Sequence, residues 1–286
     1  MRHFKRIRAV PLLCLPLAPA LAQTPVIGAE GGGVCSSATV KGTYAVSLSG
    51  RQVSSTGTFT NVFQANGTAT FDGLSAVVLA LTSNTLQAVG TPLPMSGTYM
   101  VEANCVGSIE INSGGSATFN LAIYNAGASS GASFAIAGSD ATYSYNGSAN
   151  TTPSNCNLAM LSGVYVFTST GYGFSGAAVN EAGNITGLLQ FDGHGNVTAN
   201  ANVGSSSTVT GTYSMSSNCV GSATLTDANG KSSVMSLSVY SGNTAASTDF
   251  YVTLAQSSKF MVIGTAHAVY GQPTASLRRR GSGRKA

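Results

Sequence analysis

The sequence predicts an all-β protein built from two related antiparallel units, each closed into a small up-and-down barrel. Three observations carry this prediction: apolar residues alternate with small polar ones, glycine-containing turn signals separate the alternating segments, and one twelve-residue segment occurs twice. The two copies are GTYMVEANCVGS at 97–108 and GTYSMSSNCVGS at 211–222. After residue 22, no stretch keeps the i, i+3, i+4, i+7 pattern of an amphipathic helix for three turns.

Strands are predicted wherever apolar residues recur at every second position. Tyr44, Val46 and Leu48, for example, alternate with alanine and serine. A period of two over five or more residues indicates a strand with one buried and one solvated face. Other segments of this kind are 119–123, 235–239 and 250–254.

Turns are predicted where Asn-Gly, Asp-Gly or similar pairs interrupt the alternation, because these residues supply the positive φ angles of tight hairpins. Strands joined by such short turns pair with their sequence neighbours and form an antiparallel meander. The predicted turns lie at 66–67, 113–115, 125–127, 146–147, 192–193, 229–230 and 241–242.

The cysteines and tyrosines occur at matching positions in the two halves of the chain. Cys35 precedes Tyr44 by nine residues, and Cys156 precedes Tyr165 by nine. Phe-Asp-Gly follows in each half, and a later Gly-Thr-Tyr lies shortly before a second cysteine. We interpret this order as a tandem duplication, and each unit is large enough to fold around its own core. The predicted units are 35–150 and 156–272, joined by the segment SANTTPSN at 148–155.

Each unit is expected to hold eight or nine strands, and an open sheet of that size tends to curl or split. Closure into a barrel removes the edge strands, so we favour a barrel, with a two-sheet β-sandwich as the alternative. In both arrangements the tyrosine of the repeated G-T/V-Y segment points inward at a strand start, and its glycine lies where the chain bends.

The ends of the chain differ from its body. Residues 1–22 combine a basic start, an apolar run too short to span a bilayer and the site Ala20-Leu21-Ala22, which predicts a secretory signal peptide that includes Cys14. Residues 273–286 are expected to form a basic disordered tail, able to touch an anionic surface. Without both ends, four basic residues remain against nine acidic ones, a net charge of about −5. The formal charge of +4 therefore does not indicate a nucleic-acid-binding domain, whose basic residues gather on a folded face.

Four cysteines remain after the signal peptide, two at matching places in each unit. In an exported protein this pattern indicates disulfides, and the duplication selects the pairs Cys35–Cys105 and Cys156–Cys219. A zinc site would need ligands at short local spacings, and the sequence contains no C-x-x-C or histidine pair. Closing loops of 70 and 63 residues stabilises each unit by roughly 4 kcal/mol in the chain-entropy argument.

Few residues of the mature chain suit catalysis. Asp72 and Asp192 recur in Phe-Asp-Gly, as two carboxylates recur in the two lobes of aspartic proteases. The hydroxyl residue that follows the aspartate in that family is replaced by Gly73 and Gly193. We therefore interpret both aspartates as residues that cap a hairpin turn.

The remaining site candidates are the two histidines after the signal peptide, His194 and His267. No G-x-S-x-G segment precedes a helix, and the sequence has no phosphate-binding loop, no dinucleotide fingerprint and no calcium loop. We expect no cofactor and no metal, and the candidate site consists of Asp72, Asp192, His194 and His267.

The order of Cys, G-x-Y, F-D-G-x-G-N, G-T-Y and N-C-V-G-S resembles a group of exported bacterial proteins, mostly uncharacterised, that are built from this unit. The resemblance covers both halves and is closer in the second, because residues 74–76 replace the H-G-N of the turn in the first. It implies no activity. The number of strands also resembles calycin-type barrels, which hold small apolar ligands in the barrel mouth, but a shared architecture does not carry function.

Three functions are compatible with these observations. The first is a non-catalytic binding, cell-surface or structural protein, exported to the periplasm, the cell surface or the medium, with a small apolar ligand or a glycan as partner. The second is an exported hydrolase or isomerase with a sparse site in a barrel cavity. The third is an outer-membrane β-barrel, although the chain lacks the tryptophan of the usual aromatic girdles. The first is favoured, since no catalytic constellation, nucleic-acid-binding face or membrane-spanning segment is found.

Peptide mapping of the mature protein under non-reducing conditions is expected to link Cys35 to Cys105 and Cys156 to Cys219, because each unit is predicted to close its own loop. A peptide that joins Cys35 to Cys156 would contradict the interpretation as two units.

Overall fold

The computed structural model describes residues 34–53, 59–85, 90–125, 132–175, 178–202, 206–241, 248–256 and 260–269. The predicted signal peptide at 1–22, with Cys14, and the basic tail at 273–286 lie outside these residues. No helix in these ranges has the length and hydropathy needed to cross a membrane.

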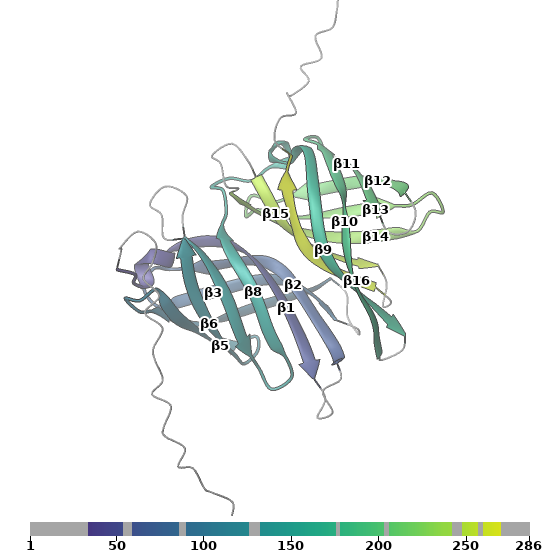
Figure 1. The fold of residues 1–286 in the computed structure, drawn as a ribbon. Helices are drawn as coiled ribbons and strands as arrows, with labels where there is room; N and C mark the ends of the chain where they lie inside the picture. Colours follow the sequence, from purple (N-terminus) through teal and green to yellow (C-terminus); the bar gives the residue numbers. More distant parts are fainter. Residues whose placement is uncertain are drawn as a thin grey trace, which may run out of the picture.

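The described residues form two eight-stranded antiparallel barrels, which confirms the predicted fold class (Figure 1). The strands of the first barrel are β1 (Gly42–Val53), β2 (Phe59–Phe71), β3 (Ala76–Thr85), β4 (Thr91–Val101), β5 (Val106–Ser113), β6 (Ala117–Asn125), β7 (Ser133–Ser139) and β8 (Ser144–Thr151). Those of the second are β9 (Ser162–Ser175), β10 (Ala178–Asp192), β11 (Asn196–Asn202), β12 (Ser206–Met215), β13 (Val220–Thr226), β14 (Ser232–Ser241), β15 (Thr248–Gln256) and β16 (Phe260–Ala268). A short 3-10 helix precedes each barrel, η1 (Ser37–Val40) and η2 (Leu158–Met160).

Each barrel is an up-and-down meander. The strands pair in chain order, and the barrels close where β8 pairs with β1 and β16 pairs with β9. Closure leaves no edge strand, so each unit is a barrel and the sandwich alternative does not apply.

Four aromatic side chains pack near one end of each barrel. In the first barrel, the ring of Phe71 lies 4.8–5.6 Å from the rings of Tyr44, Tyr99 and Phe134. All three contacts are edge-to-face, the geometry that aromatic quadrupoles favour. The second barrel repeats the arrangement at distances of 4.9–5.7 Å, with Phe191 surrounded by Tyr165, Tyr213 and Phe250.

The tyrosines of the Gly-Thr-Tyr segments hold a 3-10 helix across this end. The hydroxyl of Tyr99 donates to the carbonyl of Ser37 in η1 at 3.0 Å. The hydroxyl of Tyr213 donates to the carbonyl of Leu158 in η2 at 2.8 Å. We call the end that carries the 3-10 helix the closed end of each barrel, and the opposite end the open end.

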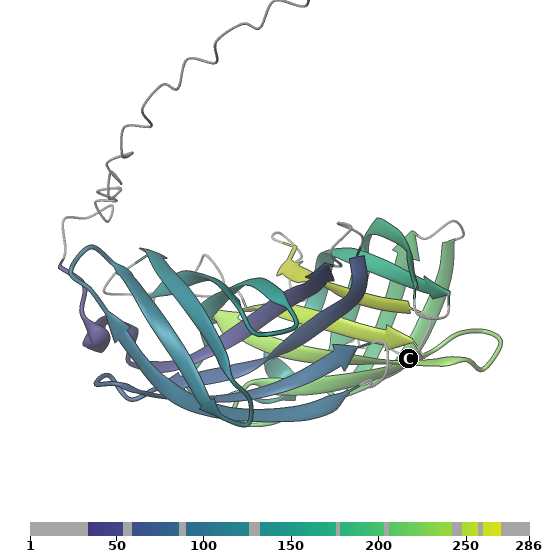
Figure 2. The same cartoon turned by 90° about the horizontal axis from the view of Figure 1, so that it is seen from below.

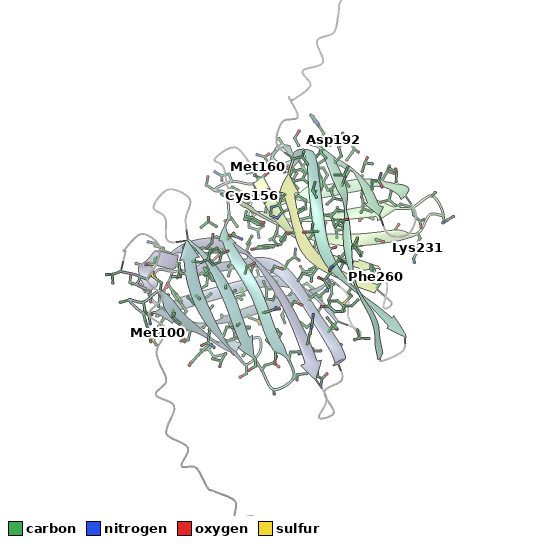
Figure 3. All side chains as sticks on the ribbon, viewed as in Figure 1. Met100, Cys156, Met160, Asp192, Lys231 and Phe260 are labelled. Atoms are coloured by element: carbon green, nitrogen blue, oxygen red, sulfur yellow. A yellow bond between two sulfur atoms is a disulfide. The ribbon has the colours of Figure 1, made fainter. Side chains whose placement is uncertain are left out.

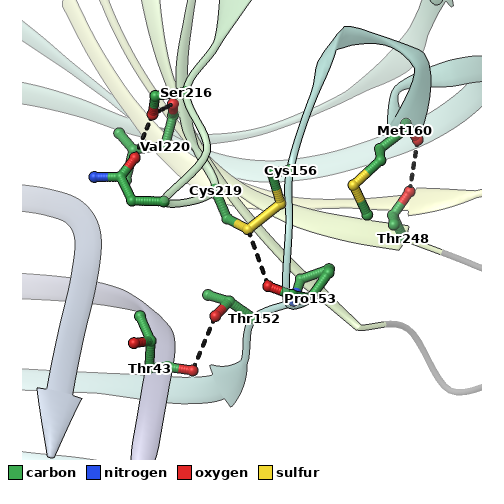
Figure 4. Close-up of a disulfide and its surroundings, with 10 residues drawn as sticks. Thr43, Thr152, Pro153, Cys156, Met160, Ser216, Cys219, Val220 and Thr248 are labelled. Carbon is green, nitrogen blue, oxygen red and sulfur yellow. Dashed lines mark hydrogen bonds between the residues drawn. A yellow bond between two sulfur atoms is a disulfide. The ribbon is translucent and has the colours of Figure 1, made fainter.

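One disulfide lies at each closed end. The pairs are Cys35–Cys105 and Cys156–Cys219, as predicted. Figure 4 shows the second of them. Cys105 and Cys219 both adopt a φ of 67°, a left-handed conformation that is uncommon outside glycine, asparagine and aspartate. The repeated N-C-V-G-S segment therefore forms the same turn in both barrels.

Two predicted turns are wrong, because 66–67 lies within β2 and 146–147 lies within β8. A Cβ added at Gly67 would lie 2.1 Å from the carbonyl oxygen of Ala80 on the neighbouring strand. This glycine therefore permits a close approach of two strands rather than a turn. The turns predicted at 113–115, 192–193 and 229–230 are confirmed, and those at 125–127 and 241–242 lie largely outside the described residues.

The two barrels lie side by side (Figure 2). β1, β2 and β8 of the first barrel contact β14 and β15 of the second, and β2 also contacts β10 and β16. Asn66 of β2 is fully buried there. Its side-chain amide donates to the carbonyl of Ser236 at 2.9 Å, and its oxygen accepts from the hydroxyl of Thr253 at 2.9 Å. A buried amide is thus satisfied by the partner barrel, as buried polar groups require.

Tyr251 of β15 makes a second set of bonds between the barrels. Its hydroxyl is hydrogen-bonded to Ser148 at 2.7 Å and accepts from the side chain of Asn150. Burial raises the pKa of Tyr251 to about 12, so the phenol stays protonated at neutral pH. Further along β1, the guanidinium of Arg51 donates to the hydroxyl of Tyr172 at 2.8 Å.

The segment between the barrels is held at both ends. The backbone amide and hydroxyl of Thr152 both donate to the carbonyl of Thr43 at 3.0 Å, and Cys156 is held by its disulfide (Figure 4). The predicted linker at 148–155 is therefore partly wrong, because residues 148–151 belong to β8. The polar residues of this segment that lie in β8 instead contact Tyr251 through their side chains.

Asn66→Ala is expected to lower the free energy of unfolding by about 1–3 kcal/mol, because it removes the bond to the Ser236 carbonyl and leaves the buried Thr253 hydroxyl without its acceptor. Chemical denaturation of the whole chain measures the effect. Asn120→Ala, at an exposed position of β6, is the matched control and should change stability little. Equal values for the two variants would contradict the contact between the barrels.

Candidate functional site

Asp72 and Asp192 cap hairpin turns at the closed ends of different barrels. Oδ1 of Asp72 accepts from the backbone amides of Leu74, Ser75 and Ala76 at 2.8–3.0 Å. These bonds, led by that from Leu74, hold the pKa of Asp72 below its usual value. The turn interpretation therefore accounts for this carboxylate.

Asp192 occupies the equivalent place at the end of β10. Its Oδ1 accepts from the backbone amides of His194 and Asn196 at 2.7 and 2.9 Å, and its Oδ2 accepts from the side chain of Asn196. These bonds, first that from the Asn196 side chain, lower the pKa of Asp192 to about 2. Nδ1 of His194 faces the carbonyl of Asp192 at 2.8 Å, so this histidine belongs to the turn itself.

His267 lies elsewhere, on β16. Its Nδ1 is 3.0 Å from Oδ2 of Asp249 on β15, and the two residues are direct cross-strand neighbours by the strand register. The side chain of Asp249 is 7% exposed and that of His267 is 53% exposed. Asp249 also accepts from the backbone amide of Ala268 at 3.0 Å, which fixes the carboxylate and hence the imidazole. Sequence reasoning missed Asp249, because the pairing depends on the register of two strands.

The four candidates are thus not assembled into one site. Asp192 and His194 share a turn, Asp72 lies in the other barrel, and His267 pairs with a residue outside the candidate set. Within the described ranges, no three histidine, cysteine, aspartate or glutamate side chains gather in a way that could hold a metal ion.

The open end of the second barrel contains a cavity of about 170 Å³. β13 runs from Val220, next to Cys219, to Thr226, so the β13–β14 hairpin lies opposite the disulfide. Figure 3 shows Lys231 of this hairpin and Phe260 away from Cys156 and Met160. The lining is mostly apolar and includes Phe167, Leu189, Met235, Val252, Phe260 and Val262.

The open end of the first barrel is filled by four aromatic rings. Phe63 lies 5.8 Å from Tyr143 and 5.4 Å from Tyr145, and Phe119 lies 5.6 Å from Tyr145. The side chain of Asn61 donates to the Tyr143 hydroxyl at 2.7 Å. These rings occupy the space that is hollow in the second barrel.

The strand registers identify the residues behind this difference. Gly50 lies opposite Phe63, whereas Gly171, in the matching place, lies opposite Gly183. A Cβ added at Gly183 would meet no atom within 4 Å. The second barrel therefore has no side chain where the first carries a phenylalanine ring; Gly183 itself is exposed, and the cavity lining begins two residues further along β10, at Ile185.

Two further pairs of matching positions carry different side chains in the two barrels. In the first barrel, Phe119 lies opposite Ile109, and Ile109 lies opposite Tyr99. In the second barrel, Met235 lies two strands away from Tyr213 in the same way, so Met235 matches Phe119. Tyr145 and Val262 correspond in the same way, opposite Gly50 and Gly171. The sequence contained this signal, but it becomes visible only when inward-facing positions of the two halves are compared.

A groove of about 460 Å³ lies between the barrels and is lined mainly by uncharged polar residues. Several of its hydroxyls already have partners: Thr253 bonds Asn66, and Ser214 and Ser222 bond one another at 3.1 Å. The cavity of the second barrel is therefore the stronger candidate for ligand binding.

Comparisons with known proteins yield distant structural similarity alone. No protein family and no curated protein matches the sequence. A protein of unknown function from the DUF3598 family of Nostoc punctiforme is similar at a TM-score of 0.27 and 10% identity, over 81% of this chain and 97% of that one. Transferrin-binding protein B, a vaccine antigen of Haemophilus parasuis, is similar at a TM-score of 0.23 and 9% identity, over 79% of this chain and 74% of that one. Values this low support no inference about function, which has to come from the site itself.

Asp192→Asn is expected to leave the barrel folded, because the amide oxygen can still accept the backbone bonds of the turn. Because its pKa is lowered, Asp192 stabilises the folded protein at pH values above about 4, the ordinary pKa of an aspartate. This stabilisation is lost as the pH falls towards 2. The variant should therefore be less stable at pH 7, and the difference from the unchanged protein should disappear near pH 2. Thermal unfolding followed by circular dichroism between pH 2 and 7 measures this. A difference independent of pH would contradict the electrostatic explanation.

Proposed function

We propose that this chain is an exported, non-catalytic binding protein whose second barrel holds a small apolar ligand in its open end. The observation that carries the proposal is the apolar cavity of about 170 Å³ in the second barrel, set against the filled open end of the first. Ligand sites are typically concave and apolar with a few polar groups at fixed places, and this cavity has that character.

The volume limits the size of the ligand. An engineered cavity of about 150 Å³ in another protein binds benzene, so one six-membered ring or a short branched chain fits here. Burying a ring of that size removes roughly 200 Å² of apolar surface from water and gives affinities in the millimolar range. A larger ligand would have to extend beyond the cavity.

The direction of the side chains favours this proposal over an outer-membrane barrel. Along residues 76–81 of β3 and along β13 the buried positions are apolar, while residues such as Thr224 are exposed. An outer-membrane barrel has the reverse arrangement, with an apolar band outside and a polar interior. The two disulfides support export, because such bonds persist in oxidising compartments.

The enzyme alternative receives less support. His267 and Asp249 form an oriented pair, but neither residue lines the cavity of the second barrel or the groove between the barrels. The pair links β15 to β16 at the closed end, and this structural role requires no substrate.

Filling the cavity is expected to abolish binding. Gly183→Phe with Met235→Phe introduces the two phenylalanines that the first barrel carries at the matching places, and should weaken toluene binding at least tenfold. Isothermal titration calorimetry with toluene measures the affinity, and toluene should also raise the unfolding temperature of the unchanged protein by linkage.

Val234→Phe is the matched control, because Val234 neighbours Met235 on β14 but is 51% exposed on the outer face. This variant should bind toluene as the unchanged protein does. Failure of the unchanged protein to bind toluene, or equal binding by the filled variant, would contradict the proposed cavity function.

A further inference from the structure

Two opposite charges line the mouth of the cavity. Asp227 and Lys231 belong to the hairpin between β13 and β14, and both contribute to the lining. The backbone amide of Asp227 donates to the carbonyl of Lys231 at 3.0 Å, so the two residues face one another across the hairpin. Along both strands every second residue points inward, as Leu225 and Met235 do, and Asp227 and Lys231 continue these rows.

The carboxylate of Asp227 is held in place before any ligand arrives. Its Oδ1 accepts from the backbone amides of Asn229 and Lys231 at 2.9 and 2.8 Å. No described residue bonds Oδ2, which leaves one carboxylate oxygen for a ligand. A group fixed in this way loses little conformational entropy on binding.

The ammonium of Lys231 makes no ion pair with Asp227 or with any other acidic residue in the described ranges, where His267 and Asp249 form the ion pair that is found. Opposite charges placed across a hairpin ordinarily attract one another. Because the two charges cancel, the mouth favours neither a simple cation nor a simple anion. A ligand with one charge of each sign matches both groups at once.

The first barrel lacks these charges. Ser113 follows Ile111 by two residues, as Asp227 follows Leu225, and Ile111 and Leu225 hold matching places in the register. The charged pair therefore occurs in the barrel that has the cavity, and a neutral serine occurs at the matching position of the barrel whose open end is filled. If Asp227 only capped its hairpin, an aspartate would be expected at the matching position of the first barrel as well.

We propose that the ligand is a zwitterion with a compact apolar side group, of which an apolar α-amino acid is the simplest case. Its ammonium binds Oδ2 of Asp227, its carboxylate binds Nζ of Lys231, and its side group occupies the apolar cavity. This inference rests on the proposed function of the cavity and adds the chemical class of the ligand.

Four probes that share one ring separate the contributions: toluene, phenethylamine, 3-phenylpropionate and L-phenylalanine. They carry no charge, the ammonium, the carboxylate and both charges, respectively. In calorimetric titrations of the oxidised full chain, L-phenylalanine should bind about fivefold more tightly than either singly charged probe, the upper range for an exposed ion pair.

Two variants assign the charges. Asp227→Asn, which keeps an oxygen acceptor for the hairpin, should reduce L-phenylalanine affinity about fivefold and leave toluene binding unchanged. Lys231→Gln, at an exposed side chain, should do the same without touching the hairpin bonds. Asp140→Asn and Lys41→Gln in the first barrel are matched controls and should alter neither probe, because Asp140 caps a hairpin of the filled barrel in a similar way.

The outcomes distinguish the two proposals. Binding of toluene with equal or weaker binding of L-phenylalanine overturns the zwitterion and leaves the cavity function intact. Equal affinity for phenethylamine and L-phenylalanine also overturns it, because Lys231 then has no role. Absence of binding by all four probes overturns both proposals.

Discussion

The structure depends on the edge-to-face packing of four aromatic rings at the closed end of each barrel. Phe71 and Phe191 lie at the centre of these clusters, and the tyrosines around them carry hydroxyls that reach the 3-10 helices. The same Phe-Asp-Gly that supplies the central ring supplies the aspartate that caps the next turn. A single short segment therefore contributes both to the core and to the hairpin, and its aspartate is already committed to backbone amides. The hydrogen bonds of both repeated aspartates are therefore those of hairpin turns.

Because the closed end is held by rings, a 3-10 helix and a disulfide, the open end is able to vary without loss of the fold. In the first barrel, Phe63 and Phe119 help to fill that end. In the second, Gly183 and Met235 occupy the matching places, and an apolar cavity remains. Leaving apolar space unfilled costs stability, since the residues around a cavity lose dispersion contacts. The intact closed end of the barrel stabilises the fold against that cost, and the ligand that we propose for the cavity would restore part of the lost contacts.

The packing of one barrel against the other uses outward-facing side chains and so leaves both barrel interiors independent. Asn66 and Tyr251 carry much of this contact through hydrogen bonds that only the partner barrel can complete. Gln64 and Ser238 are also fully buried, and their side-chain polar atoms have no bond in the described part of the chain. An unsatisfied buried group is costly, and the contact also contains buried apolar side chains, with Val62 of β2 against Tyr172 and Met261 of the second barrel.

The sequence by itself determined the all-β class and the two disulfides, because period-two alternation and matched cysteine spacing are local or repeated signals. It favoured barrels but left a two-sheet sandwich open, and the pairing of β8 with β1 and of β16 with β9 in the tertiary structure decided for barrels. It also identified the aspartates as turn caps, since Phe-Asp-Gly contains its own turn chemistry. It misplaced turns at 66–67 and 146–147, where asparagine and glycine serve strand approach and barrel contact instead. Only the tertiary structure decided that His267 meets Asp249, that the barrels share a buried polar face and that one open end is hollow. Each of these depends on which residues of distant strands lie opposite one another, and a register of strands is set by the packing of the whole barrel rather than by any one segment.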